Sequence, residues 1–341
     1  MSSLRTSFTR LRSHPLAICM ALLGILVVLA AVSICVGAVA VPLKAVAEAL
    51  LHGENASVYG RIVLYSRLPR TCGSILAGAA LAVSGVIIQT VMANPLAAPH
   101  IIGVNSGAGL GAVLCCAFFP AAVNWIPAAA FLGALAGTML VLLFAQRTGA
   151  SRITLVLAGV AISGMFSAGI DTIIMLVPDA LTGYTDFRVG GLNGVTMAKL
   201  LPAAVMIAIA MVASFSMTPQ LDVLALGSET AQSLGLSVRP VRLTLLILAA
   251  AMAGASVSFS GLLGFVGLIV PHVMRTLVGE DSLPLMGASA LGGAILLTFC
   301  DLLARTVASP YEISVGIVLS YIGTPFFLWL LVRQRGERTH D

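Results

Sequence analysis

Charge is scarce in this chain: Asp, Glu, Lys and Arg make up 9% of its 341 residues, whereas 59% are hydrophobic. A soluble domain carries roughly 25% charged residues. Most of the chain therefore cannot face water, which excludes a soluble globular protein. The apolar runs are continuous and rich in Leu, Ala and Gly rather than alternating with polar residues, so we expect membrane-spanning helices and not an outer-membrane barrel.

Several kinds of site chemistry are also missing. The chain has two lysines, Lys44 and Lys199, and neither follows a glycine as in a P-loop, so ATP binding through that motif is excluded. The motifs HExxH and GxSxG are absent. The six cysteines form no CxxC pair and lie in or beside apolar runs, where small buried hydrophobic residues are the simplest interpretation. We therefore expect no catalytic residue, no metal site and no cofactor in this chain.

The apolar runs predict an all-α membrane protein with about ten transmembrane helices in one permease domain over residues 1–341. Each crossing needs roughly 20 apolar residues, and the run at 264–276 is too short unless it extends or tilts. The first run resembles a signal peptide but is too long for one, so we expect an uncleaved first span. The membrane bundle is expected over 16–333, with spans at 16–41, 71–92, 101–119, 126–146, 152–177, 200–216, 243–262, 264–276, 284–300 and 313–333.

Ten spans place both termini on one side of the membrane. More Lys and Arg fall on that side than on the other, so the positive-inside rule predicts a multi-pass protein of the cytoplasmic (inner) membrane with both termini cytoplasmic. The informative exceptions lie outside, where Arg61, Arg67 and Arg70 share one segment and Arg305 lies near the far end of the chain. These are either snorkelling residues at helix ends or a basic site for an acidic partner, and charge alone leaves both open.

One acidic residue, Asp171, falls inside the fifth run without the GxGD context of an intramembrane protease. A single carboxylate is also thin support for an ion-coupled carrier, because such carriers usually hold several buried charges. We interpret Asp171 as a buried, hydrogen-bonded structural group. Elsewhere, Gly103, Gly107 and Gly111 form GxxxGxxxG, which predicts close helix packing.

Two polar interruptions stand out among the spans. VMANPLAAPHIIGVNSGAG at 91–109 predicts a turn between the second and third spans, with Asn94–Pro95 ending a helix because a residue before proline avoids the α region. ALGSETAQSLGLSVRP at 225–240 is either an ordinary amphipathic loop or a short helix that docks into a cytoplasmic partner, with Gly235 permitting a sharp turn.

Several motifs in order resemble the FecCD-type family, the permeases of ABC importers for iron-siderophore, haem and vitamin B12. The matching stretches, over roughly residues 60 to 333, are RLPR at 67–70, NPLAAPHIIGVNSGAG at 94–109, GFVGLIVPH at 264–272 and DLLAR at 301–305. The chain departs from the family pattern at Ala93, at Ser282–Leu283 and at Ser314, where the family usually has proline.

The resemblance implies a type II ABC importer permease fold with ten helices per subunit. It implies that the permease forms a homodimer, or pairs with a close paralogue. This pair would assemble with a cytoplasmic ATPase dimer that binds the ATP. A substrate-binding protein, periplasmic or lipid-anchored, would deliver the cargo; no nucleic acid is involved. The cargo would be a metal chelate, first of all a ferric siderophore. Haem and cobalamin stay open, and an ion-coupled secondary transporter is the alternative from another class.

The resemblance also assigns residues. Docking of the binding protein would use Arg67, Arg70 and Arg305 at the wet outer rim. ATPase coupling would use the loop at 221–240, through Glu229, Ala231 and Gly235. The translocation path between two copies would be lined by the fifth and tenth spans, at Ser163, Ser167, Asp171, Gly316, Ser320 and Gly323, and Asn94 and Pro95 would form a turn with a possible gate role.

Overall fold

The computed structural model describes residues 14–37, 39–54, 58–147, 152–309 and 311–338. Ten main helices fill this part of the chain, which confirms the predicted all-α membrane fold. Seven of them are long and apolar enough to cross a membrane, and three are shorter apolar helices. They are α2 (Pro15–Cys35), α5 (Leu68–Met92), α6 (Val104–Phe118), α7 (Ile126–Arg147), α8 (Arg152–Leu176), α10 (Met197–Ser216), α13 (Val238–Ser260), α14 (Val266–Val278), α15 (Ser282–Thr306) and α16 (Val315–Arg338).

The helices pack around α5, which contacts α15, α13 and α14 along most of its length. Small residues make this approach possible: a Cβ on Gly78 would overlap the backbone carbonyl of Gly293 in α15. Ser74 and Thr298 share a hydrogen bond of 2.9 Å across the same pair of helices. Close backbones and buried hydroxyl bonds are what holds helices together where lipid removes the hydrophobic driving force.

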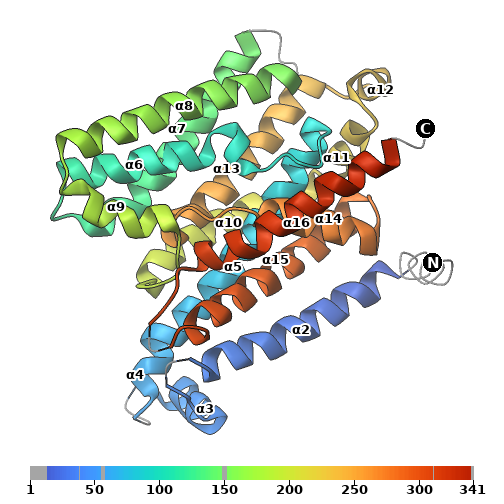
Figure 1. The fold of residues 1–341 in the computed structure, drawn as a ribbon. Coiled ribbons are helices and arrows are strands. Elements are labelled where there is room, and N and C mark those ends of the chain that lie inside the picture. Colours follow the sequence, from blue (N-terminus) through green and yellow to red (C-terminus); the bar gives the residue numbers. More distant parts are fainter. Residues whose placement is uncertain (1–13, 38, 55–57, 148–151, 310, 339–341) are drawn as a thin grey trace.

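A second close pair, α6 and α7, confirms the packing expected from the glycine repeat, since a Cβ on Gly107 would overlap the carbonyl oxygen of Gly133. This pair carries α8 on its flank. Figure 1 shows α6, α7 and α8 at the opposite side of the molecule from α2. Little of α2 is buried, and its side chains are apolar nearly all round, as suits a helix that faces lipid.

Short helices connect the long ones and account for the errors in the predicted spans. The first span ends at Cys35 rather than 41, and α3 (Leu43–His52) and α4 (Gly60–Ile62) follow it. A short helix that no span prediction contained, α9 (Ala180–Val189), follows α8. A π-helix, η1 (Val63–Arg67), joins α4 to α5, and a 3-10 turn, η3 (Val123–Trp125), precedes α7. Between α10 and α13 lie α11 (Thr218–Ala225) and α12 (Ser228–Ser233).

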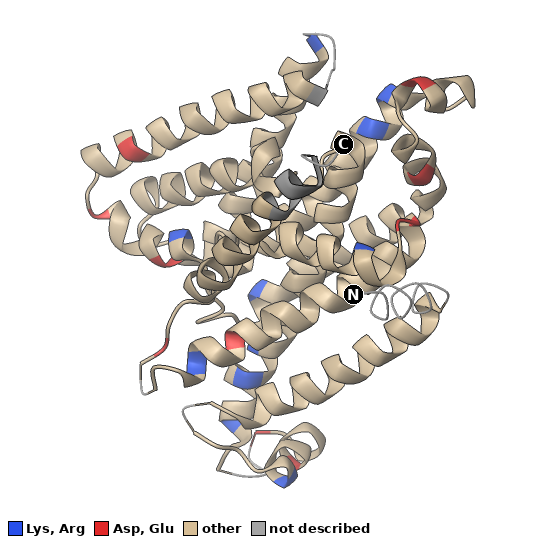
Figure 2. Cartoon of the chain, turned by 45° about the vertical axis from the view of Figure 1, so that its right-hand side comes forward, with Lys and Arg blue, Asp and Glu red and all other residues tan. Residues whose placement is uncertain are grey.

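Charged residues gather toward the ends of the helices, with long uncharged stretches between them (Figure 2). The start of α2 and the end of α16 lie at the same end of the bundle as α12 (Figure 1). The start of α5 and the short helices α3 and α4 lie at the other end. This arrangement places the two candidate partner surfaces, around RLPR and around α12, at opposite ends.

Candidate functional site

The three arginines predicted to dock a partner lie together at the end of the bundle opposite α12. Arg67 ends the π-helix η1 directly before α5, Arg70 comes from the first turn of α5, and Arg305 comes from the last turn of α15. With Asp301 and Glu312 they form what we call the arginine cluster. All three arginines are buried, with exposed fractions of 7%, 7% and 2%. The predicted wet-rim placement is therefore wrong for the single chain, although the grouping of the three residues is right.

Arg70 is the centre of the arginine cluster. Its Nε donates to Oδ1 of Asp301 at 2.8 Å, and its Nη1 donates to Oε2 of Glu312 at 2.7 Å. Nη1 also donates to the side-chain oxygen of Asn193 at 2.7 Å. The guanidinium thus joins α5 to α15, to the segment before α16 and to the segment after α9.

Arg305 and Arg67 connect the same site to the end of α2. Nη2 of Arg305 donates to Oγ of Ser33 at 2.7 Å and lies 3.1 Å from Oδ2 of Asp301. Nη1 of Arg67 donates to the carbonyl oxygen of Val36 at 2.7 Å. Two carboxylates against three guanidinium groups leave the arginine cluster with one excess positive charge.

Glu312 is the member of the arginine cluster that reaches the surface. Its side chain is 33% exposed, whereas the Asp301 side chain is fully buried. Water or another protein can therefore reach the Arg70–Glu312 pair from the Glu312 side. Sequence analysis did not single out Glu312 or Asp301, although an acidic residue four positions before Arg305 on one helix was a readable signal.

The predicted path residues of α8 lie on two different surfaces. Ser163 accepts a hydrogen bond of 3.0 Å from Ser106 and ties α8 to α6. Ser167 and Asp171 lie on an exposed face of α8. The interpretation of Asp171 as a buried structural group is therefore wrong: in the single chain its carboxylate is open to whatever packs on α8.

The predicted path residues of α16 border a cleft of about 680 Å³ between this helix and the end of α9. Gly316 and Ser320 line it, together with Arg188 and Tyr321, which sequence analysis did not assign. Gly323 lies deeper, where a Cβ would overlap the ring of Phe265. Because α8 packs on α6 and α7 whereas α16 packs on α14 and α15, one chain does not gather the two halves of the predicted path.

Phe265 is a further residue that sequence analysis did not assign. It precedes α14 with φ of 65°, a conformation that a bulky residue rarely adopts. Strain of this kind persists only where the surrounding structure enforces it, and it gathers at functional sites. Here the ring fills the space that Gly323 of α16 leaves open.

The stretch at 91–109 forms the predicted turn, with a detail that the prolines did not reveal. Helix α5 ends at Met92, and Ala93 takes left-handed φ of 44°. The side-chain oxygen of Asn94 then accepts a 2.9 Å hydrogen bond from the amide of Leu96. Asn94 and Pro95 therefore shape the corner, and a single turn of 3-10 helix, Pro99–Ile102, leads into α6.

The 221–240 segment contains the end of α11, all of α12 and the start of α13, so the expected short helix is present at α12. Its docking to a cytoplasmic partner stays a prediction. In α12, Glu229 is exposed and Ala231 is fully buried. Gly235 follows with φ of 84°, and no atom lies within 4 Å of the position that a Cβ would take, so backbone conformation rather than space favours glycine there. Helix α12 projects at one end of the bundle (Figure 1), and Glu229 and Thr230 are among its exposed residues.

Comparisons with known proteins agree over most of the chain. The model of the FecCD transport family matches residues 25–333. The Fe(3+)-citrate import system permease protein YfmE of Bacillus subtilis (strain 168) is 36% identical over 324 residues, or 95% of this chain and 97% of the relative. The hemin transport system permease protein HmuU of Yersinia pestis is 38% identical over 284 residues, or 82% and 85% of the two chains. A solved inward-facing structure of a metal-chelate type ABC transporter superposes with a TM-score of 0.83 at 29% identity, over 93% of this chain and 99% of that one.

Removing the buried carboxylate of the arginine cluster tests its importance to the fold. Asp301→Asn leaves two buried guanidinium groups without their shared counter-charge, which typically costs about 3–5 kcal/mol. We expect a clear fall in the thermal unfolding midpoint of the detergent-purified chain. Glu48→Gln is the control, since Glu48 pairs with Lys44 at 4.0 Å on an exposed helix and should contribute little. Equal midpoints for both variants would contradict a structural role for the arginine cluster.

Proposed function

This chain belongs to the FecCD transport family, and on that premise we propose that it is the permease subunit of an ABC importer that carries a ferric siderophore across the cytoplasmic membrane. The observation that carries the proposal is the family match over residues 25–333, joined to a similar metal-chelate type transporter structure. Of the two relatives described above, YfmE is named for ferric citrate and HmuU for hemin. Haem therefore stays as the second candidate cargo. An ion-coupled carrier is set aside because the family and the relatives described above are import-system permeases.

The partners follow from this function. We propose that ATP is bound and hydrolysed on a separate cytoplasmic ATPase dimer and that a substrate-binding protein delivers the chelate. A second permease copy, or a close paralogue, would cover the exposed face of α8 that carries Ser167 and Asp171. In one chain, α8 packs on α6 and α7 whereas α16 packs on α14 and α15. Pairing of two permease copies would therefore be needed to bring the path residues of α8 and α16 together. Weakly polar walls suit a cargo that must bind and also leave.

Coupling to the ATPase would run through α12. Its exposed face offers Glu229 to a partner while Ala231 anchors the helix against the bundle. A short helix followed by a turn of fixed geometry would transmit a movement of the ATPase to the bundle better than a flexible loop would. Gly235 has a positive φ and lies three residues before α13, most of which is buried in the bundle.

Docking of the binding protein needs a route to the buried arginines. We propose that Glu312 occupies the place of an incoming carboxylate in the resting permease. Its side chain is partly exposed, and it holds Arg70 through one 2.7 Å bond, so an acidic residue of the binding protein could replace it there. The excess positive charge of the arginine cluster favours such an exchange. Charge pairs of this kind set orientation and association rate more than raw affinity.

Uptake into proteoliposomes tests the proposed function. Vesicles that hold this chain and its ATPase should accumulate a ferric siderophore only with internal ATP and external binding protein. Haem offered in the same vesicles should enter far more slowly. Uptake driven by a proton or sodium gradient alone would refute the importer, whereas ATP-driven uptake of haem in preference to siderophore would leave the importer intact and reverse the cargo.

The coupling role of Gly235 is tested by Gly235→Val. A β-branched residue disfavours a φ of 84°, so the turn should distort without any steric clash nearby. We expect ATP-driven uptake to fall about tenfold or more while the ATPase still hydrolyses ATP. Ser237→Val, two residues later at φ of −73°, is the matched control and should retain uptake. Full uptake by the Gly235 variant would remove this turn from the coupling route.

The exchange at Arg70 is tested by Glu312→Gln. Loss of the internal carboxylate should leave Arg70 more available, and we expect binding-protein affinity to rise roughly fivefold at low salt, with the gain shrinking as salt rises. Glu54→Gln is the control, because it removes the same charge from an exposed pair with Arg61 at the same end. If both variants bind the partner equally well, Glu312 does not compete for its site.

A further inference from the structure

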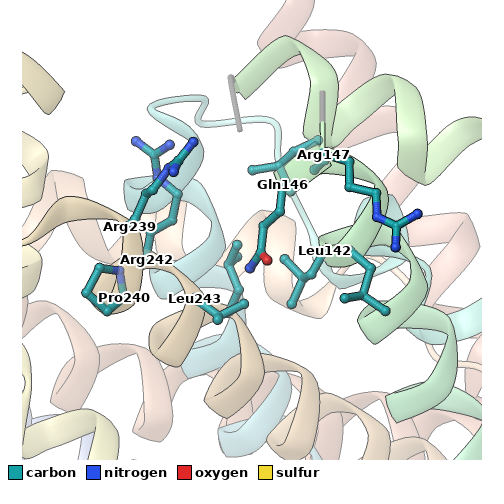
Figure 3. Close-up of a pocket in the computed structure, with 11 residues that line it drawn as sticks. Leu142, Gln146, Arg147, Arg239, Pro240, Arg242 and Leu243 are labelled. Atoms are coloured by element: carbon teal, nitrogen blue, oxygen red, sulfur yellow. The ribbon is translucent and has the colours of Figure 1, made fainter. Parts of the chain in front are cut away.

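A basic pocket lies at the end of the bundle near α12, away from the arginine cluster and from the proposed path. It has a volume of about 480 Å³ and is formed by the last turns of α7, the start of α8 and the first turns of α13. Figure 3 shows Arg239 and Arg242 side by side on one wall, and Arg147 on the opposite wall with its guanidinium turned away from them. Nothing in the proposed transport cycle uses this pocket.

The pocket combines two kinds of surface. Leu142, Leu155 and Leu246 form a floor of nearly fully buried apolar side chains. Above it, the amide of Gln146 points into the gap between the walls (Figure 3). The rim is basic, and no acidic side chain in the described part of the chain lines it. A ligand that fits must therefore carry a negative group and an apolar portion.

The pocket also opens toward the membrane-facing side of α7. Leu132, Met139 and Leu143 are exposed along one stripe of that helix, and Leu143 lines the pocket itself. A stripe of exposed apolar residues on a spanning helix is where acyl chains lie. The stripe leads to the basic rim, which lies at helix ends, at the depth where lipid head groups are found.

We propose that this pocket binds the head group of an anionic phospholipid, with Arg239 contacting its phosphate, the exposed Arg147 side chain turning inward to reach the same phosphate, and the α7 stripe holding its acyl chains. Basic pockets between transmembrane helices are known to suit anionic head groups. Arg242 takes part from a fixed position, since it donates a 2.9 Å hydrogen bond to Ser228 of α12. A lipid held here would brace α12 against the bundle through that bond. A free phosphate ion would gain nothing from the leucine floor, so the lipid is the better occupant.

Lipid titration of the purified full-length chain tests the proposal. Phosphatidylglycerol should bind the wild type at a tight site by native mass spectrometry, about tenfold or more tightly than phosphatidylcholine. The double variant Arg147→Gln/Arg239→Gln should lose most of that preference, at roughly fivefold for each charge. Arg239→Lys should keep most of it, which separates charge from folding. Arg61→Gln, an exposed arginine at the other end of the bundle, is the matched control and should bind like the wild type.

Three outcomes would overturn the proposal. One is equal binding of phosphatidylglycerol and phosphatidylcholine by the wild type. Another is unchanged phosphatidylglycerol binding by the double variant; if that variant also fails to hold the ATPase subunit, the pocket is a protein contact instead. The third is displacement of the lipid by millimolar inorganic phosphate, which would make the site a simple anion site. None of these depends on uptake, so failure here leaves the importer function untouched.

Discussion

Three guanidinium groups buried at one end of a membrane bundle must find counter-charges and carbonyl oxygens inside the protein, and much of the architecture follows from meeting that requirement. Buried charge without partners costs several kcal/mol for each ion. Asp301 on α15 and Glu312 before α16 supply the carboxylates, and Ser33 and Val36 at the end of α2 supply oxygens. With Asn193 after α9, five separate segments are thereby fixed at one point, although little of α2 itself is buried.

The opposite end of the bundle exposes polar side chains that a partner protein could contact. There α12 projects with exposed polar residues, its orientation set by the positive φ of Gly235. Between the two ends, small residues let α5 approach α15 and α6 approach α7, so that a movement of one helix must move its partner. A rigid centre with polar groups tied together at one end and a projecting helix at the other suits the ATPase-driven transport proposed above.

Hydrophobic runs predicted the fold well because a span needs only length and apolarity, both of which are local properties. The glycine spacing of α6 and the turn at Gly235 were likewise readable, since each depends on a few neighbouring residues. The burial of the arginines could not be predicted in this way, because Arg70 pairs with Asp301, which lies 231 positions away in the chain. The same limit applies to Asp171, whose exposure depends on which helices cover α8. Helix α9 was missed because its sequence, ALTGYTDFRV, is short and mixed in polarity.

In the docking proposal, Glu312 holds the place of the binding protein's carboxylate on Arg70. A structure of the permease with its binding protein attached tests this most directly. We expect an acidic side chain of the binding protein within hydrogen-bond distance of the Arg70 guanidinium, with Glu312 turned away from it. An attached binding protein whose acidic residues contact other groups, while Arg70 and Glu312 remain paired as they are in the single chain, would contradict it.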